Sequence, residues 1–122
     1  MATLVLALHQ ALDDNAPHQR SSLLAYHYAQ AALHSGHQIL QVFFYHHAVS
    51  IAQADSSAPL VCQAQQSWLQ LAEQHQFDLV YCATIAERDL GLGQEHMVSG
   101  FTGAGVTEFA QAAARADRVM QF

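Results

Sequence analysis

Residues 77–86, FDLVYCATIA, decide which fold this chain can adopt. The first part, Phe77 to Tyr81, is an apolar run with the β-branched and aromatic side chains of a buried strand. Cys82 ends the run, and a segment that can turn helical follows at once. In an open α/β sheet, the carboxyl ends of parallel strands face the crevice where ligands bind. The sequence therefore predicts Cys82 at the ligand-binding edge of a sheet.

Cys82 is the candidate reactive atom of this chain. A thiol near the first turn of a helix feels amide hydrogens and the positive end of the helix dipole, which favour the nucleophilic thiolate. The alternative is a buried structural cysteine, a common fate for this small apolar residue. For Cys62, on a helix beside Trp68, we favour a packed or incidental role.

The composition indicates a single domain, residues 1–122, that is long enough to close one core. Hydrophobic residues make up 52% of the chain and charged residues only 11%, so much of the surface is expected to be buried, in part against other subunits. No apolar run approaches the roughly 20 residues of a membrane span. Residues 1–8 lack a basic region and suggest a first strand, so we expect a cytoplasmic protein without membrane attachment.

The charge balance argues against nucleic-acid binding. The chain has no lysine, a formal charge of −6, and four cations, which are Arg20, Arg88, Arg115 and Arg118. Direct nucleic-acid binding is not expected, because neutralising phosphates supplies most of that affinity. The two cysteines lack CxxC spacing and are expected to be free thiols.

Strand-like and helix-like segments alternate along the chain. Strands are expected at Thr3–Leu8, Ile39–Tyr45, Phe77–Tyr81, Met97–Phe101 and Arg118–Phe122. Helices are expected from Pro17 and His18 to Gly36, at 46–51, on 61–75 with Ser57 as a candidate cap, after Cys82, and at 106–115. Strands separated by helices imply right-handed crossovers. The predicted fold is α/β, a single three-layer flavodoxin-like domain with a mostly parallel five-stranded sheet.

Neither a metal site nor a cofactor is expected. The nine histidines include no HExxH motif, and the pairs His34/His37 and His46/His47 lack a third ligand at diagnostic spacing. His46 and His47 are most simply surface residues, although one of them could stabilise a thiolate at the same sheet edge. The glycines of residues 100–105 match no phosphate-binding motif and more simply permit a tight turn or a close subunit approach.

Three blocks of sequence resemble the small sulfur-relay proteins of the DsrE/TusD family, most of all its TusD-like members. The resemblance covers nearly the whole chain. Its strongest pieces are Ser35-Gly36-His37 leading into VFFYHHAV at 42–49, the cysteine at 82 that ends a central strand, and GFTGAG at 100–105 through Glu108 to DRVMQF at 117–122.

The resemblance implies a sulfurtransferase that works as a subunit of a complex. In this family the cysteine at the position of Cys82 accepts sulfane sulfur as a persulfide and passes it to a partner cysteine. The implied partners are two homologous subunits (TusB/TusC- or DsrF/DsrH-like) in a heterohexamer, an upstream persulfide donor and a downstream TusE/DsrC-like acceptor. The implied destination is tRNA wobble 2-thiouridine synthesis or DsrEFH-type sulfur oxidation.

Two segments depart from the family pattern. Residues 9–15 replace its glycine- and proline-containing loop, and Arg88 lies between Glu87 and Asp89 where the family is usually basic. Nearby carboxylates oppose thiolate formation. The alternatives are a non-catalytic structural subunit of a DsrEFH/TusBCD-like complex and a small flavodoxin-like domain that would co-purify with a nucleotide or flavin.

Overall fold

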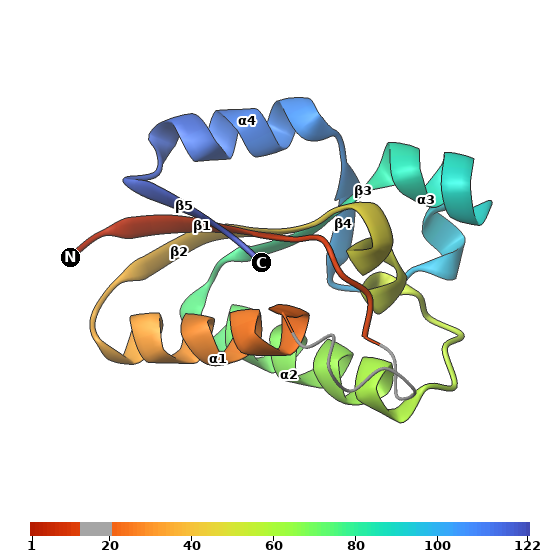
Figure 1. Cartoon of the computed structure of the whole chain (residues 1–122), viewed down its shortest axis with the longest axis horizontal. Coiled ribbons are helices and arrows are strands. Elements are labelled where there is room, and N and C mark those ends of the chain that lie inside the picture. The colour runs from red at the N-terminus through yellow and green to blue at the C-terminus, as the bar shows by residue number, and fades with distance from the viewer. Residues whose placement is uncertain (13–20) are drawn as a thin grey trace.

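The computed structural model describes residues 1–12 and 21–122 (Figure 1). The described strands are β1 (Thr3–Leu8), β2 (Gln38–Phe44), β3 (Asp78–Cys82), β4 (Phe101–Ala104) and β5 (Arg118–Gln121). The α-helices are α1 (Ser21–His34), α2 (Pro59–His75), α3 (Ala83–Leu90) and α4 (Val106–Arg115). Two 3-10 helices complete the order, η1 (His46–Ala52) after β2 and η2 (Gln94–His96) before β4.

The five strands form one sheet in the order β4-β3-β2-β1-β5, and every neighbouring pair is parallel. Helices α1 and α2 cover one face, α4 crosses the other, and α3 lies beyond the carboxyl end of β3 (Figure 1). The chain moves outward from β1 to β4 and then returns across the sheet through α4 to add β5. The three-layer α/β prediction is confirmed.

The largest packed side chains gather between the sheet and the pair α1 and α2. Phe44 of β2 and Trp68 of α2 are at most 1% exposed and meet edge to face with ring centres 5.9 Å apart. Tyr26 of α1 approaches Trp68 edge-on at 5.1 Å, and Phe101 of β4 approaches Phe44 at 5.3 Å. These contacts join two helices and two strands, which fixes the sheet on its helical layer.

The helix predictions agree with the structure except at some ends. The predicted start at Pro17 and His18 lies outside the described residues. Helix α2 begins at Pro59 with Ala58 as its N-cap and no capping side chain, so the predicted Ser57 cap was wrong. Proline at the first turn needs no donor there and presets the helical φ, which explains the start without a cap. None of the helices within the described residues is long and apolar enough to cross a lipid bilayer.

The fourth strand was predicted at Met97–Phe101 but runs from Phe101 to Ala104. Met97 instead makes an isolated antiparallel bridge with Gln53. Gly103, one of the glycines expected to permit a tight turn or a close subunit approach, lies within the strand. A Cβ atom at position 103 would come within 2.8 Å of the Tyr81 hydroxyl oxygen, so this strand position accepts only glycine without a rearrangement.

Candidate functional site

Cys82 lies where the sequence placed it. It is the last residue of β3 and the N-cap of α3, with extended backbone angles of φ −74° and ψ 105°. Cys82 pairs with Ala104 of β4, and on the other side of β3 the pairing with β2 ends one residue earlier, at Tyr81. Its sulfur therefore lies at the carboxyl edge of the sheet, next to the unpaired amide hydrogens that begin a helix.

The thiol of Cys82 is closed off from solvent in the isolated chain. Its residue is only 2% exposed, whereas the chemistry expected from the sequence needs a sulfur that another thiol can reach. That expectation of an exposed sulfur is not met. The apolar pattern of the strand predicted the position of Cys82 at its carboxyl end. The burial of the thiol depends on tertiary packing, which that local pattern does not contain.

The strand register places Cys82 on the sheet face that α4 covers. Phe43 pairs with Val80, and Cys82 follows Val80 by two residues, so all three side chains share one face. Phe43 stacks on Phe109 of α4 with ring centres 4.8 Å apart. The residue after β2, Tyr45, stacks on Phe43 at 5.9 Å and continues this aromatic row toward the level of Cys82.

A surface ion pair on α3 lies within electrostatic reach of the thiol. Arg88 Nε is 2.9 Å from Asp89 Oδ1, and both side chains are largely exposed. The pKa of Arg88 is raised, first by the hydrogen bond and charge of Asp89 and then by weaker interactions with Tyr45 and Cys82. The negative charge of Asp89 opposes ionisation of the Cys82 thiol, and the positive charge of Arg88 beside it partly offsets that effect.

His46 and His47 lie at the same sheet edge, as the sequence suggested. Both are exposed, their ring centres are 4.2 Å apart, and His46 has a positive φ of 56°. With Asp89 they line a pocket of about 210 Å³. The pKa of Asp89 is lowered, mainly by its hydrogen bond with Arg88 and to a smaller extent by these two histidines.

The remaining candidates show no ligand arrangement. Within residues 1–12 and 21–122, no group of three or more histidine, cysteine or acidic side chains is placed to hold a metal ion. Cys62 is free and half-buried, and its thiol donates to the Ser56 carbonyl oxygen at 3.3 Å. This contact agrees with the packed role that the sequence favoured for Cys62.

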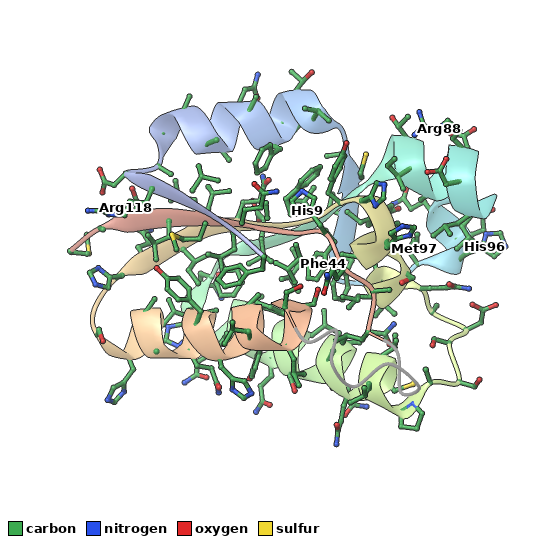
Figure 2. The ribbon with its side chains drawn as sticks, in the orientation of Figure 1. His9, Phe44, Arg88, His96, Met97 and Arg118 are labelled. Carbon is green, nitrogen blue, oxygen red and sulfur yellow. The ribbon has the colours of Figure 1, made fainter. Side chains whose placement is uncertain are left out.

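A feature that the sequence did not reveal is an apolar cavity at the carboxyl ends of β1, β2 and β5, under the first turn of α4. Its volume is about 190 Å³. The lining residues come from four separate segments: Ala7, His9, Phe43, Tyr45, Val106, Phe109, Val119 and Gln121. Figure 2 shows His9 on the α4 side of the sheet and Phe44 on the opposite side. The sequence feature that could have pointed to this cavity was His9, a polar residue directly after the end of β1.

Comparison with known proteins identifies the family. The family model described as DsrE/DsrF-like matches residues 11–122. The chain belongs to the DsrE/DsrF-like family. The resemblance noted in the sequence is thereby confirmed.

Named relatives of this DsrE/DsrF-like chain include sulfurtransferases. It is 34% identical to the DsrE protein of Allochromatium vinosum over 86% of this chain and 88% of that one. Sulfurtransferase TusD of Serratia proteamaculans is 35% identical over 80% and 84% of the two chains. The TusD homolog of Vibrio parahaemolyticus, also named a sulfurtransferase, is 33% identical over 84% and 87%.

Solved structures share the fold of this DsrE/DsrF-like chain. The YchN protein of E. coli superposes with a TM-score of 0.75 at 20% identity, covering 100% of both chains. The MTH1491 protein of Methanobacterium thermoautotrophicum gives the same score at 15% identity, again over 100% of both. At these identities the likeness concerns the α/β architecture alone.

Proposed function

We propose that this chain is a sulfurtransferase subunit that carries sulfane sulfur as a persulfide on Cys82. The observation that carries the proposal is the position of Cys82, at the tip of a central strand and the start of α3. Helix amides and dipole there favour the thiolate. The family membership and the relatives named sulfurtransferases support the same chemistry.

The proposed reaction is two successive thiol exchanges. The Cys82 thiolate attacks the outer sulfur of a donor persulfide, a new S–S bond forms, and the donor leaves as its thiolate. An acceptor thiolate then attacks the outer sulfur of the Cys82 persulfide, and Cys82 leaves as a thiolate. The outer sulfur keeps its proton or charge through both steps, so no net oxidation occurs and no cofactor is needed.

The burial of Cys82 adds a requirement to this reaction. A thiolate must approach the sulfur in line with the bond that breaks, and a residue that is 2% exposed gives no such path. We therefore propose that the side chains over Cys82 move when a partner docks. Arg88, within electrostatic reach of Cys82, is placed to favour the charged sulfur once it opens.

The finer parts of the proposal follow the family. The partners would be two homologous small subunits in a heterohexamer, a persulfide donor and a TusE/DsrC-like acceptor, in the cytoplasm. The sulfur would serve either 2-thiouridine synthesis in tRNA or sulfur oxidation. The low charged fraction, 11%, agrees with a chain that buries surface against sister subunits.

The test is mass spectrometry after incubation with a protein persulfide donor. A gain of one sulfur mapped to Cys82 is expected in the wild type and in Cys62→Ser, and absent in Cys82→Ser. Both variants should match the wild type in circular dichroism. A sulfur found on Cys62, or on neither cysteine when the sister subunits and donor are present, would refute the proposal.

The second candidate function is a non-catalytic structural subunit of such a complex, and the burial of Cys82 is the observation that favours it. The two functions differ in the assembled state. A carrier should react with a thiol reagent faster once its partners are added, whereas a structural cysteine should stay as slow as in the isolated chain. Cys62→Ser protein isolates the signal of Cys82.

A further inference from the structure

We propose that Tyr45 is the residue that controls access to Cys82: its ring covers the thiol in the isolated chain, and turning of that ring lets another thiol reach the sulfur. This inference rests on the proposed function, because it names the side chain whose movement the buried sulfur requires. The strand register around Cys82 and the sizes of the side chains on either side of it carry the inference.

The strand register places Tyr45 directly beside Cys82. The pairing of β2 with β3 ends at Phe44 and Tyr81, and the residues that follow are Tyr45 and Cys82. Tyr45 keeps an extended backbone, with φ −127° and ψ 156°, and its N–H donates to the Leu8 carbonyl oxygen of β1 at 2.9 Å. It therefore continues the line of β2 and stands at the level of Cys82 on the neighbouring strand.

The two side chains also share one face of the sheet. Side chains alternate along a strand, so Tyr45 lies on the face of Phe43, on which it stacks, and Cys82 lies on the face of Val80. Phe43 and Val80 are register partners, and Phe43 stacks on Phe109 of α4. Tyr45 and Cys82 are therefore neighbours on the face that α4 crosses (Figure 1), on strands that lie about 4.8 Å apart.

Tyr45 is the larger of the two side chains that flank Cys82 in the sheet. On the β4 side Cys82 pairs with Ala104, whose methyl group is too small to close over a sulfur atom. On the β2 side is the Tyr45 ring, which is half-buried, whereas Cys82 is 2% exposed. On this face the sheet can therefore cover the thiol only from the Tyr45 side.

The electrostatics of α3 agree with this placement. The pKa of Arg88 is raised mainly by its hydrogen bond with Asp89, and to a smaller extent by interactions with Tyr45 and with Cys82. One guanidinium group thus lies within electrostatic reach of both the Tyr45 hydroxyl and the Cys82 sulfur. Both groups are near the same side chain of α3, although they come from different strands.

The Tyr45 ring is held by contacts that it can exchange. It stacks on Phe43 with ring centres 5.9 Å apart and meets the His9 ring edge to face at 5.3 Å. The apolar cavity of about 190 Å³ under the first turn of α4 borders the ring and leaves space beside it. The ring can therefore turn about its own side-chain bonds while the strand keeps its hydrogen bonds.

The experiment measures how fast a neutral thiol reagent labels Cys82 in the full chain carrying Cys62→Ser. Tyr45→Ala removes the ring and should speed labelling about 10-fold or more, because no opening step then precedes the reaction. Tyr45→Phe keeps the ring and should restore the slow labelling of the wild type. The matched control is Tyr28→Ala, which removes a half-buried tyrosine ring from α1 on the opposite layer and should leave labelling slow.

Three results would overturn the proposal. Tyr45→Ala that is labelled as slowly as the wild type would show that the ring is not the cover. Tyr28→Ala that is labelled as fast as Tyr45→Ala would show that lost stability, and not the lost ring, exposes the sulfur. Tyr45→Phe that is labelled as fast as Tyr45→Ala would show that closure depends on the hydroxyl group and not on the ring.

Incubation with glutathione persulfide separates this inference from the proposed function. The Cys82 thiolate attacks the outer sulfur of the donor, and glutathione leaves as its thiolate. Mass spectrometry should find one added sulfur on Cys82 of Tyr45→Ala in the absence of any partner subunit. Fast labelling of Tyr45→Ala with no added sulfur would refute the carrier function and still support the role of Tyr45.

Discussion

Thr3 and Asp117, which lie 114 positions apart, are joined by hydrogen bonds of both their backbones and their side chains. The Asp117 carboxylate accepts from the Thr3 backbone N–H at 2.8 Å and from the Thr3 hydroxyl at 3.1 Å. The Asp117 N–H in turn reaches the Thr3 hydroxyl oxygen at 3.0 Å. These bonds fasten the beginning of β1 to the turn that enters β5, so they hold the last strand in the sheet.

This pair predicts a pH-dependent stability. Hydrogen bonds from the backbone and side chain of Thr3 lower the pKa of Asp117 below its ordinary value of 3.8. A lowered folded-state pKa stabilises the protein above 3.8, and the stabilisation is lost as the pH falls below that value. Asp117→Asn should therefore lower Tm by a few degrees at pH 7 and by less near pH 3.

The measurement is thermal unfolding by circular dichroism across pH 2.5–7, a range chosen to cover the ordinary pKa of an aspartate. Glu73→Gln, an exposed change on α2, is the control and should follow the wild type at every pH. Equal differences between Asp117→Asn and wild type at both ends of the range would contradict the assignment.

Gly103 and Tyr81 predict a specific steric coupling. A methyl group at position 103 would come within 2.8 Å of the Tyr81 hydroxyl oxygen, and Tyr81 is buried. Gly103→Ala should cost about 1–3 kcal/mol, as expected for overpacking. In a Tyr81→Phe background the cost should fall, because the clashing oxygen is gone. Urea unfolding of the four proteins measures the coupling, and additive effects would show that the two positions do not interact.

The parts of the fold that the sequence predicted are those with a strong local pattern. β1 and α4 have the predicted bounds, because the continuous apolar run of β1 and the helical pattern of α4 are reinforced by packing in and on the sheet. The position of Cys82 was predicted in the same way, because the apolar run of β3 ends at this cysteine. These features depend on neighbours within one segment.

The parts that were missed depend on contacts between distant segments. β4 begins four residues beyond the predicted start at Met97. It contains Gly103, and the reason for a glycine at this strand position is seen only in its close approach to Tyr81 of the neighbouring strand. The burial of Cys82 and the cavity beside His9 likewise arise from the packing of segments that are far apart in the sequence. No single stretch of sequence encodes them.

The ion pair on α3 predicts opposite effects of two substitutions on the reactivity of Cys82. Asp89→Asn removes a negative charge and should speed alkylation of Cys82 about twofold, whereas Arg88→Gln should slow it by a similar factor, as expected for exposed charges that act through water. Both effects should shrink in about 1 M salt. Rates are measured in Cys62→Ser protein with a neutral alkylating reagent.

A matched variant makes this comparison decisive. Glu73→Gln changes the net charge as Asp89→Asn does, but on the far helical layer, and should leave the rate unchanged. If Glu73→Gln speeds alkylation as much as Asp89→Asn, the effect is one of total charge and the local role of the pair is rejected. If both α3 variants change the rate in the same direction, the electrostatic explanation also fails.

The cover over Cys82 predicts how the thiol opens. Phe109 is the α4 side chain that stacks on Phe43, on the face that Cys82 shares. Removing its ring in Phe109→Ala should loosen α4 by about 1–2 kcal/mol, which corresponds to roughly a 5- to 30-fold larger open population. Labelling of Cys82 by a thiol reagent, in Cys62→Ser protein, should rise by that factor.

Gln111→Ala, on the exposed side of α4, is the control and should leave the labelling of Cys82 unchanged. A lower Tm with unchanged labelling would mean that Cys82 becomes accessible without movement of α4. In that case α3 and η1 would be the elements that have to move when a partner docks.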